Sequence, residues 1–305
     1  MASRRSPGSG LPWANLGFLY LHNGDIELAN KSFSRTQMAD PEFVPGWLGQ
    51  AMIAETLGSA EAIELFETCL LSVSAPKVSN SDILSDMHGG MQHSCRPIAD
   101  YGYARQVWKM AVERNSRLDG KPLPLQASVA KSGDKPGNAV SKQALSFSEQ
   151  SRLVLGIYAA RRYVAQAGDD GISAGTHLLG MLLEQNGEYE SAAEAYLAAY
   201  AQGAAEGNGT AAESARMRQW VALAHLGRAQ CGAGQFDEAT ESYSRASDLL
   251  SAGVCTQLLA ARSGAMQLFY FTLGHSIALF FAQRLEESLG MFEQTLAQSE
   301  DVPEL

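Results

Sequence analysis

The sequence predicts an all-α fold, a solenoid of stacked helix-turn-helix hairpins. Trp13 and Trp47 lie 34 residues apart, which is the period of one class of helical repeat. After each of them, bulky and small residues recur at three- and four-residue steps, as they do on one face of an α-helix. Five such hairpins can be traced along the 305 residues. About three stacked repeats are enough to bury a continuous core.

The first hairpin spans residues 13–41 and carries the pattern W‑x2‑LG‑x2‑Y…A‑x3‑F‑x2‑T…P. This is the pattern of the tetratricopeptide repeat (TPR), a helical hairpin that stacks on copies of itself. Its anchor residues are Trp13, Leu16, Gly17, Tyr20, Ala29, Phe33, Thr36 and Pro41.

Each anchor of the first hairpin has a physical role. Gly17 and Ala29 are small, so we place them where the two helices cross and the backbones must approach closely. Phe33 then fills the space between the helices. Asn23‑Gly24‑Asp25 is the predicted turn, because glycine tolerates a positive φ and Asp25 can cap the second helix. Pro41 lacks an amide hydrogen, so the second helix must end before it.

Four later hairpins repeat the pattern with growing departures. The second uses Trp47, Ala51, Ala54, Ala62, Phe66 and Cys69. The third uses Thr176, Leu179, Gly180, Leu183, Ala192, Tyr196 and Ala199, with a turn at Asn186‑Gly187. The fourth uses Leu223, Leu226, Gly227, Ala239, Tyr243 and Ala246, with a turn at Gly234. The fifth keeps only Leu279, Ser288, Phe292 and Thr295.

Stacked in sequence, these hairpins are expected to form a right-handed superhelix whose first helices line a concave groove. Trp13 and Trp47 should then lie in equivalent surroundings. The groove candidates on the first helices of the first two hairpins are Asn15, Phe18, His22, Met52 and Glu55.

The domain boundaries follow from composition. The predicted segments are a disordered leader at 1–12, N-terminal hairpins at 13–115, a flexible insertion or linker at 116–147, and C-terminal hairpins at 148–300. The insertion is rich in Pro, Gly, Ser and Lys, which favours a linker. Its basic charge leaves an RNA contact as the alternative. Helices at Asp100–Arg114 and Ser148–Gln166 should pair across it, and Cys255–Phe269 is an extra segment before the fifth hairpin.

Charge is unevenly distributed along the chain, whose net charge is −10. Residues 1–150 hold 14 basic and 15 acidic side chains, whereas residues 151–305 hold 9 and 18, a net charge of −9. No lysine follows Lys142. Binding to nucleic acid requires Lys and Arg against the phosphates, so direct RNA contact is not expected. The acidic half suits basic patches on protein partners or serves only as a solvated face.

Two motifs resemble chemical sites and are better explained by structure. His88, His93 and Cys95 lie close together, but their spacing matches no standard zinc pattern and a fourth ligand is missing. Gly171‑Ile‑Ser173‑Ala‑Gly175 satisfies the G‑x‑S‑x‑G pattern, which marks a nucleophile only after a β-strand. Here a helix end precedes it, so Ser173 is expected to cap the next helix. We predict no enzyme, no metal and no cofactor.

The remaining features favour a cytoplasmic or nuclear protein. The cysteines Cys69, Cys95, Cys231 and Cys255 share no CxxC spacing, which is typical of reduced thiols inside cells. The longest apolar stretch, Leu268–Ala282, is interrupted by Gly274, His275 and Ser276 and is too short to span a membrane. The N-terminus has no apolar segment of the kind found in secretory signals.

One known family resembles part of this chain. Residues 13–66 contain "NLG‑x‑LYL", "IELA", "DP" and "W‑x‑GQA‑x‑IAE‑x‑x‑GS", followed by "LF". This stretch resembles the TPR scaffold family of the superkiller complex in animals. Residues 227–243 and 278–296 are similar to that family more weakly, because any TPR shares their anchors.

The resemblance implies a non-enzymatic scaffold. In that family the scaffold wraps an RNA helicase and β-propeller (WD-repeat) subunits, and the assembly feeds RNA to the exosome in cytoplasmic 3′-to-5′ mRNA decay. Its members are several times longer, so this chain would be an interior stretch. The alternative is a TPR co-chaperone or adaptor that binds peptide tails of other partners. Such clamps use Lys and Asn where the first hairpin has Ala14 and Phe18, and the net negative charge would repel an acidic tail.

Overall fold

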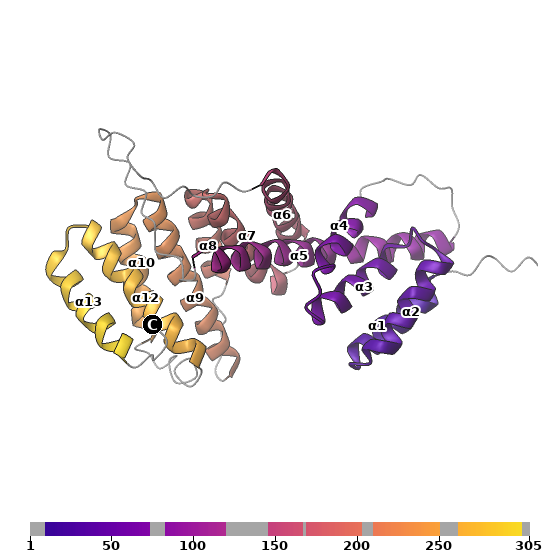
Figure 1. Cartoon of the computed structure of the whole chain (residues 1–305), viewed down its shortest axis with the longest axis horizontal. Coiled ribbons are helices and arrows are strands. Elements are labelled where there is room, and N and C mark those ends of the chain that lie inside the picture. The colour runs from indigo at the N-terminus through magenta and orange to yellow at the C-terminus, as the bar shows by residue number, and fades with distance from the viewer. Residues whose placement is uncertain are drawn as a thin grey trace, which may run out of the picture. The chain divides into compact units, whose positions relative to one another are not determined.

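A computed structural model describes residues 10–73, 83–119, 146–166, 169–202, 210–250 and 262–300. Within these ranges the chain forms twelve α-helices and no strand (Figure 1). The helices are α1 (Leu11–His22), α2 (Ile26–Ala39), α3 (Val44–Thr56), α4 (Ala62–Val73), α5 (Ile83–Asp119), α6 (Phe147–Gln166), α7 (Asp169–Asn186), α8 (Tyr189–Gln202), α9 (Thr210–Ala233), α10 (Phe236–Leu249), α12 (Arg262–Phe281) and α13 (Leu285–Glu300).

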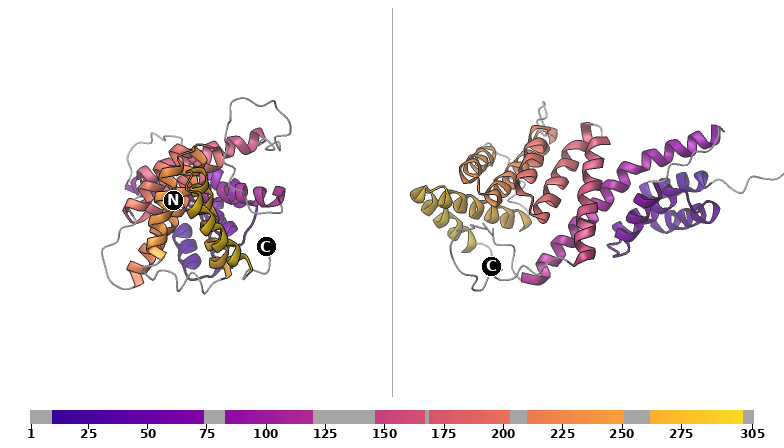
Figure 2. Two further views of the ribbon diagram at one scale, coloured as in Figure 1. Left: turned by 90° about the vertical axis from the view of Figure 1, so that its left-hand side faces the viewer. Right: turned by 90° about the horizontal axis from the view of Figure 1, so that it is seen from above.

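The predicted all-α hairpin fold is confirmed. Helices α1 and α2, α3 and α4, α7 and α8, α9 and α10, and α12 and α13 pack against each other as consecutive pairs. These are the five hairpins that the sequence pattern predicts. Each first helix from α9 onward also packs on the preceding second helix, α8 or α10, so the pairs stack (Figures 1 and 2). The chain therefore has the TPR fold class.

The chain divides into two compact units. Unit 1 consists of residues 1–110 and 154–167, and unit 2 of residues 111–153 and 168–305. Unit 1 thus holds α1 to α4 with parts of α5 and α6, and unit 2 holds the remaining parts of those two helices with α7 to α13. The right-handed superhelix and the four predicted segment boundaries stay predictions.

The core of unit 1 rests on aromatic rings held against glycines. Phe33 of α2 is fully buried, and its ring lies against Gly17 in its own hairpin and Gly49 in the next. A Cβ at Gly49 would lie 2.2 Å from Cζ of Phe33. Phe66 of α4 lies in the same way against Gly102 of α5. Each ring therefore joins two hairpins, and a larger residue at either glycine would overpack the core.

Unit 2 repeats this arrangement with tyrosine. Tyr196 of α8 lies against Gly180, and Tyr243 of α10 lies against Gly227 and Gly274. Both tyrosines are buried. In the last hairpin two small residues meet instead of a ring and a glycine. Ser288 of α13 donates a 3.0 Å hydrogen bond to the carbonyl oxygen of Ser276 of α12.

The turns within the hairpins need one residue in the left-handed backbone conformation. Gly24, Gly58, Gly187 and Gly234 all have φ between 67° and 84°, where glycine carries no steric penalty. In the last hairpin Gln283 takes the same place with φ 64°. A side chain in this region costs roughly 1–2 kcal/mol, so this turn is strained.

Two capping predictions are wrong. Asp25 precedes α2 but makes no side-chain capping bond. Ser173 lies inside α7, which begins at Asp169, so it does not cap that helix. Helix α1 begins at Leu11, and Pro12 can occupy its first turn because the donor that proline lacks is not needed there.

Three further differences concern the middle of the chain and the indoles. Helix α5 is longer than Asp100–Arg114 and contains Pro97. Its residues 116–119 fall within the predicted insertion, and residues 120–145 of that insertion lie outside the described residues. Likewise Arg262–Phe269 of the extra segment belongs to α12. Trp13 lies under the guanidinium of Arg35, whereas Trp47 donates a hydrogen bond to the Pro41 carbonyl. Their surroundings are therefore not equivalent.

Candidate protein-interaction surface

Successive first helices of unit 1 place three side chains in the same register. Phe18, Met52 and Arg105 each follow the small residue that packs in the core, Gly17, Ala51 or Ala104. The side chains of all three are partly exposed, whereas Ala51 and Ala104 are fully buried. The repeat therefore sets a row of accessible positions on α1, α3 and α5, apolar at two and cationic at the third.

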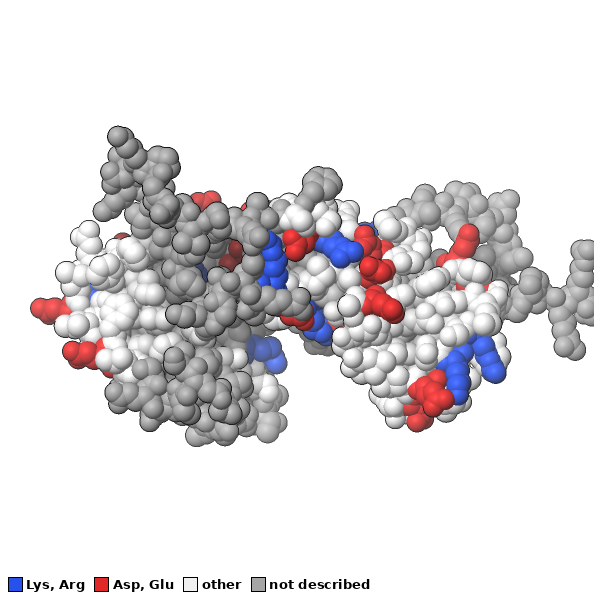
Figure 3. Space-filling view, in the orientation of Figure 1, with Lys and Arg blue, Asp and Glu red and all other residues white. Residues whose placement is uncertain are grey.

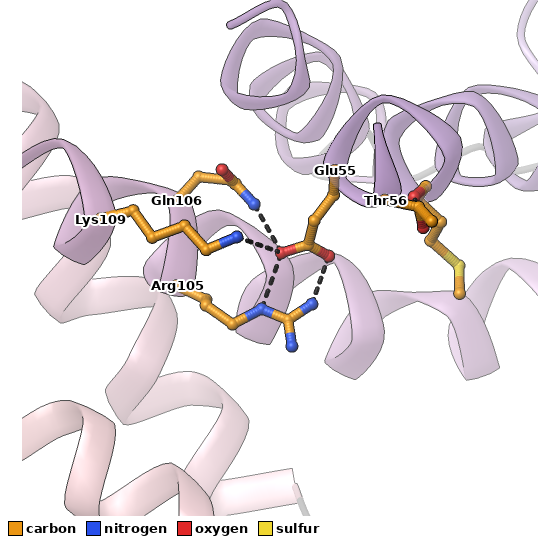
Figure 4. A network of polar contacts seen from close by, with 6 residues as sticks. Glu55, Thr56, Arg105, Gln106 and Lys109 are labelled. Carbon is orange, nitrogen blue, oxygen red and sulfur yellow. Dashed lines mark hydrogen bonds and ion pairs between the residues drawn. The ribbon is translucent and has the colours of Figure 1, made fainter. Parts of the chain in front are cut away.

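Glu55 is the centre of a polar network between α3 and α5 (Figure 4). Arg105 donates to both of its carboxylate oxygens, from Nε at 2.7 Å and from Nη2. Gln106 Nε2 donates to Oε1 at 2.5 Å, and Lys109 Nζ lies 3.7 Å from the same oxygen. One nearly buried carboxylate thus faces two cations whose side chains are about two-fifths exposed (42% and 44%).

Aromatic rings support the cationic side of this network. The Arg105 guanidinium carbon lies 5.5 Å from the centroid of the Tyr101 ring, and Tyr101 packs on Tyr163 of α6. The same two helices are also joined by an ion pair, because fully buried Asp100 of α5 pairs with Arg162 of α6. Burial raises the pKa of the Asp100 carboxyl, and the Arg162 guanidinium opposes that rise. Arg105 is therefore held in one orientation by a carboxylate on one side and a ring below.

Unit 2 contains the same ion pair at the same register. Arg228 of α9 follows Gly227, as Arg105 follows Ala104, and its Nε and Nη2 donate to Glu184 of α7 at 2.6 and 2.8 Å. Tyr196 also donates to Glu184, at 3.0 Å. Two successive first helices are thus joined by a bidentate Glu–Arg pair in both units. Such pairs fix geometry as well as charge.

Two histidines lie beside the Glu184–Arg228 ion pair in unit 2. The rings of His177 and His225 lie 4.8 Å apart, and Arg228 Nη2 lies 3.2 Å from Nδ1 of His225. Burial lowers the pKa of His177 to about 4, with a further contribution from Arg228. Burial and the same guanidinium also lower the pKa of His225 well below its ordinary value. Both rings are therefore neutral at pH 7, and His225 can accept from Arg228.

The five predicted groove residues differ in exposure and in their contacts. Asn15 and His22 are exposed on α1. Phe18 is partly buried, edge-on to Phe33 with the ring centroids 5.0 Å apart. Met52 is partly exposed, and Glu55 is occupied by its network. Sequence reasoning missed Arg105, Gln106 and Lys109; the signal that could find them is that Arg105 and Arg228 hold the same repeat position.

The sites that looked chemical have structural surroundings. Cys69, Cys95 and Cys231 are buried free thiols, and burial raises the pKa of each, to about 12, 11 and 12. The side chains of His88 and His93, and Cys255 itself, lie outside the described residues. Among the side chains described, no group of three or more His, Cys, Asp and Glu could hold a metal ion. None of the described helices is both long and apolar enough to cross a membrane.

The described surface over α1 to α4 carries few charges in the view of Figure 3. Uncharged atoms cover most of this face, and the acidic and basic side chains gather in small groups. Partner contacts on such a face would depend mainly on uncharged side chains, with a few charged groups among them.

Comparison with known proteins finds similarity to TPR and superkiller proteins. Tetratricopeptide repeat protein 37 of Xenopus laevis is 25% identical over 285 residues, which is 93% of this chain and 14% of that protein. Superkiller complex protein 3 is 46% identical over 52 residues in Mus musculus and over 48 residues in Homo sapiens. Those matches cover 17% and 16% of this chain and 3% of each relative. The chain thus spans a small part of the curated relatives' length.

Solved structures with a similar arrangement include the MamA protein, with a TM-score of 0.45 and 16% identity over 79% of this chain and 91% of that one. The Cut9–Hcn1 assembly of the APC/C gives a TM-score of 0.43 and 14% identity over 96% of this chain and 43% of that chain. No protein-family model matches the chain.

Proposed function

We propose that this chain is a non-enzymatic scaffold segment of a superkiller-type complex, which holds an RNA helicase and a β-propeller subunit for cytoplasmic mRNA decay. The observation that carries the proposal is the 46% identity over 52 residues to mouse superkiller complex protein 3. The TPR fold supports it, because stacked hairpins offer extended surfaces for other proteins. The row Phe18, Met52 and Arg105 is the surface we assign to partner contact.

The test is affinity retention of the purified superkiller helicase and propeller subunits, each offered separately to the immobilised 305-residue chain. At least one subunit should be retained in a saturable manner. A Met52→Asp variant should lose retention, because it places a charge among apolar contacts. Leu71→Asp on α4 is the matched control, since Leu71 is 66% exposed on a second helix. If neither subunit is retained, the superkiller assignment is wrong, whereas the fold is unaffected.

A further inference from the structure

Helix α13, the last described helix of unit 2, has one face that is both apolar and exposed (Figure 1). Leu285, Leu289 and Leu296 are 61%, 60% and 67% exposed, and Phe292 between them is partly exposed. These residues follow one another at steps of four, three and four positions. This is the a/d spacing of a helix that packs lengthwise against another helix. The stripe therefore has the pattern of a helix-binding face.

The same repeat positions are buried in earlier hairpins. Phe292 has the position of the buried rings on α2, α4, α8 and α10, which are Phe33, Phe66, Tyr196 and Tyr243. Three of those rings lie against a glycine of a following first helix, namely Gly49, Gly102 and Gly274. Helix α13 packs against α12, and its ring stays partly exposed. Its outer face thus corresponds to the side that a following first helix covers elsewhere.

The two edges of this face differ in charge. One edge lies against α12, where Ser288 and Thr295 are buried. The other edge carries Glu286 and Glu293, which are both exposed and lie seven residues apart, on the same side of the helix. Residues 285–296 include three glutamates and no basic residue. The edge of the face that is open to solvent is therefore acidic.

We propose that this face of α13 binds an amphipathic helix of a partner protein, whose edge of lysines or arginines meets Glu286 and Glu293. The contact stripe of the partner helix is apolar and has a glycine or alanine opposite Phe292. The small residue follows from the glycines that the earlier rings contact, and the basic edge from charge complementarity. This site lies in unit 2, apart from the row on the first helices of unit 1, and does not depend on the superkiller assignment.

Two other occupants fit these charges less well. In a pair formed with a second copy of the chain, Glu286 and Glu293 would border both helices, and like charges across an interface are unfavourable. An anionic membrane surface would meet the same acidic edge, whereas such surfaces attract basic segments. A basic helix is the occupant that the acidic edge attracts.

The experiment measures binding of labelled synthetic helices to the full chain by fluorescence anisotropy. The probe is about three heptads long, with leucines at the a and d positions, one central alanine among them and lysines along the edges. Leu289→Ser should weaken binding about tenfold or more, because a buried leucine contact is lost. Leu197→Ser is the matched control, since Leu197 is 52% exposed on α8, another second helix of unit 2. It should leave the affinity unchanged, and circular dichroism would confirm that each variant is folded.

Charge and size are tested with further variants and probes. Glu293→Gln should weaken binding of the lysine peptide about two- to fivefold. Glu287→Gln removes the same charge from the opposite side of α13, where Glu287 pairs with Arg284, and should leave the affinity unchanged. A peptide with glutamates in place of the lysines should bind more weakly. A peptide with leucine in place of the central alanine should also bind more weakly, because Phe292 needs a small residue opposite it.

Several results would overturn the inference. They are equal effects of Leu289→Ser and Leu197→Ser, equal effects of Glu293→Gln and Glu287→Gln, or equal affinity for the lysine peptide and either altered peptide. A stable dimer in sedimentation that Leu289→Ser dissociates would overturn it in favour of a second copy. Binding to phosphatidylserine vesicles that Leu289→Ser abolishes would overturn it in favour of a membrane surface.

The outcomes for α13 and for the superkiller assignment can be told apart. If the helicase or propeller subunit is retained and no peptide binds, the inference about α13 alone is wrong. If the lysine peptide binds as expected and neither subunit is retained, the superkiller assignment alone is wrong.

Discussion

The contact between Gly180 and Tyr196 allows the packing of unit 2 to be tested with one methyl group. A Cβ on Gly180 would lie 2.7 Å from Cε1 of Tyr196, whereas ordinary contacts of a Cβ begin near 3.4 Å. The ring would have to move by several tenths of an ångström. It is fully buried and its hydroxyl is hydrogen-bonded to Glu184, so it has little freedom to do so.

The expected magnitude follows from two opposing effects. Overpacking a core typically costs about 1–3 kcal/mol, and alanine in place of glycine within a helix returns roughly 0.5–1 kcal/mol. Gly180→Ala should therefore lower the free energy of unfolding by roughly 0–2.5 kcal/mol, with a central value near 1 kcal/mol. Gly290→Ala on α13 is the matched control, because no atom lies within 4 Å of a Cβ there. It should raise the same quantity by roughly 0.5–1 kcal/mol.

Urea unfolding followed by circular dichroism, with fluorescence as a second probe, measures both variants. A Tyr196→Leu change in the Gly180→Ala background should show a favourable coupling energy, since the smaller side chain makes room for the methyl group. If Gly180→Ala stabilises unit 2 as much as Gly290→Ala does, the close approach of ring and backbone is refuted.

Three further predictions concern the turn, the histidines and the last helix. Gln283→Gly should stabilise by about 1 kcal/mol, because the φ of 64° becomes strain-free; urea unfolding measures it, and a destabilised variant would contradict it. The folded-state pKa of His177 is about 4, against 6.5 for an ordinary histidine. Between pH 4 and pH 6.5 the unfolded chain therefore binds more protons than the folded chain. Stability is then lost as pH falls from about 6.5 towards 4, by up to about 3 kcal/mol; unfolding of His177→Phe should depend less on pH, and an equal dependence would refute the assignment. Leu289, 60% exposed on α13, should tolerate Leu289→Ser within about 0.5 kcal/mol while light scattering shows less aggregation; a large loss of stability would show that this side chain packs in the core.

The hairpins could be predicted because their signals are local. Phe33 and Ala29 lie within one helix, Gly24 lies in the turn before it, and Pro41 follows it, so spacing alone places them. The partner of each aromatic ring in the next hairpin, such as Gly49 for Phe33, follows once the repeat is recognised.

The polar site could not be predicted from the same signals. Glu55 and Arg105 are 50 residues apart, and only the fold brings them together. The sequence shows neither which cation meets which carboxylate nor that Pro97 lies inside a long helix. The His177 and His225 pair was missed for a similar reason, because the two rings come from different hairpins. Comparison of repeat positions would have revealed that Arg105 and Arg228 correspond.

Site-specific photocrosslinking tests the central claim most directly, namely that the first helices present the partner-binding surface. A photoreactive phenylalanine analogue replaces either Met52 on α3 or Leu71 on α4, and each variant is mixed with the superkiller helicase and propeller subunits. Crosslinks are expected from position 52 and none from position 71. Crosslinks from position 71 alone would contradict it.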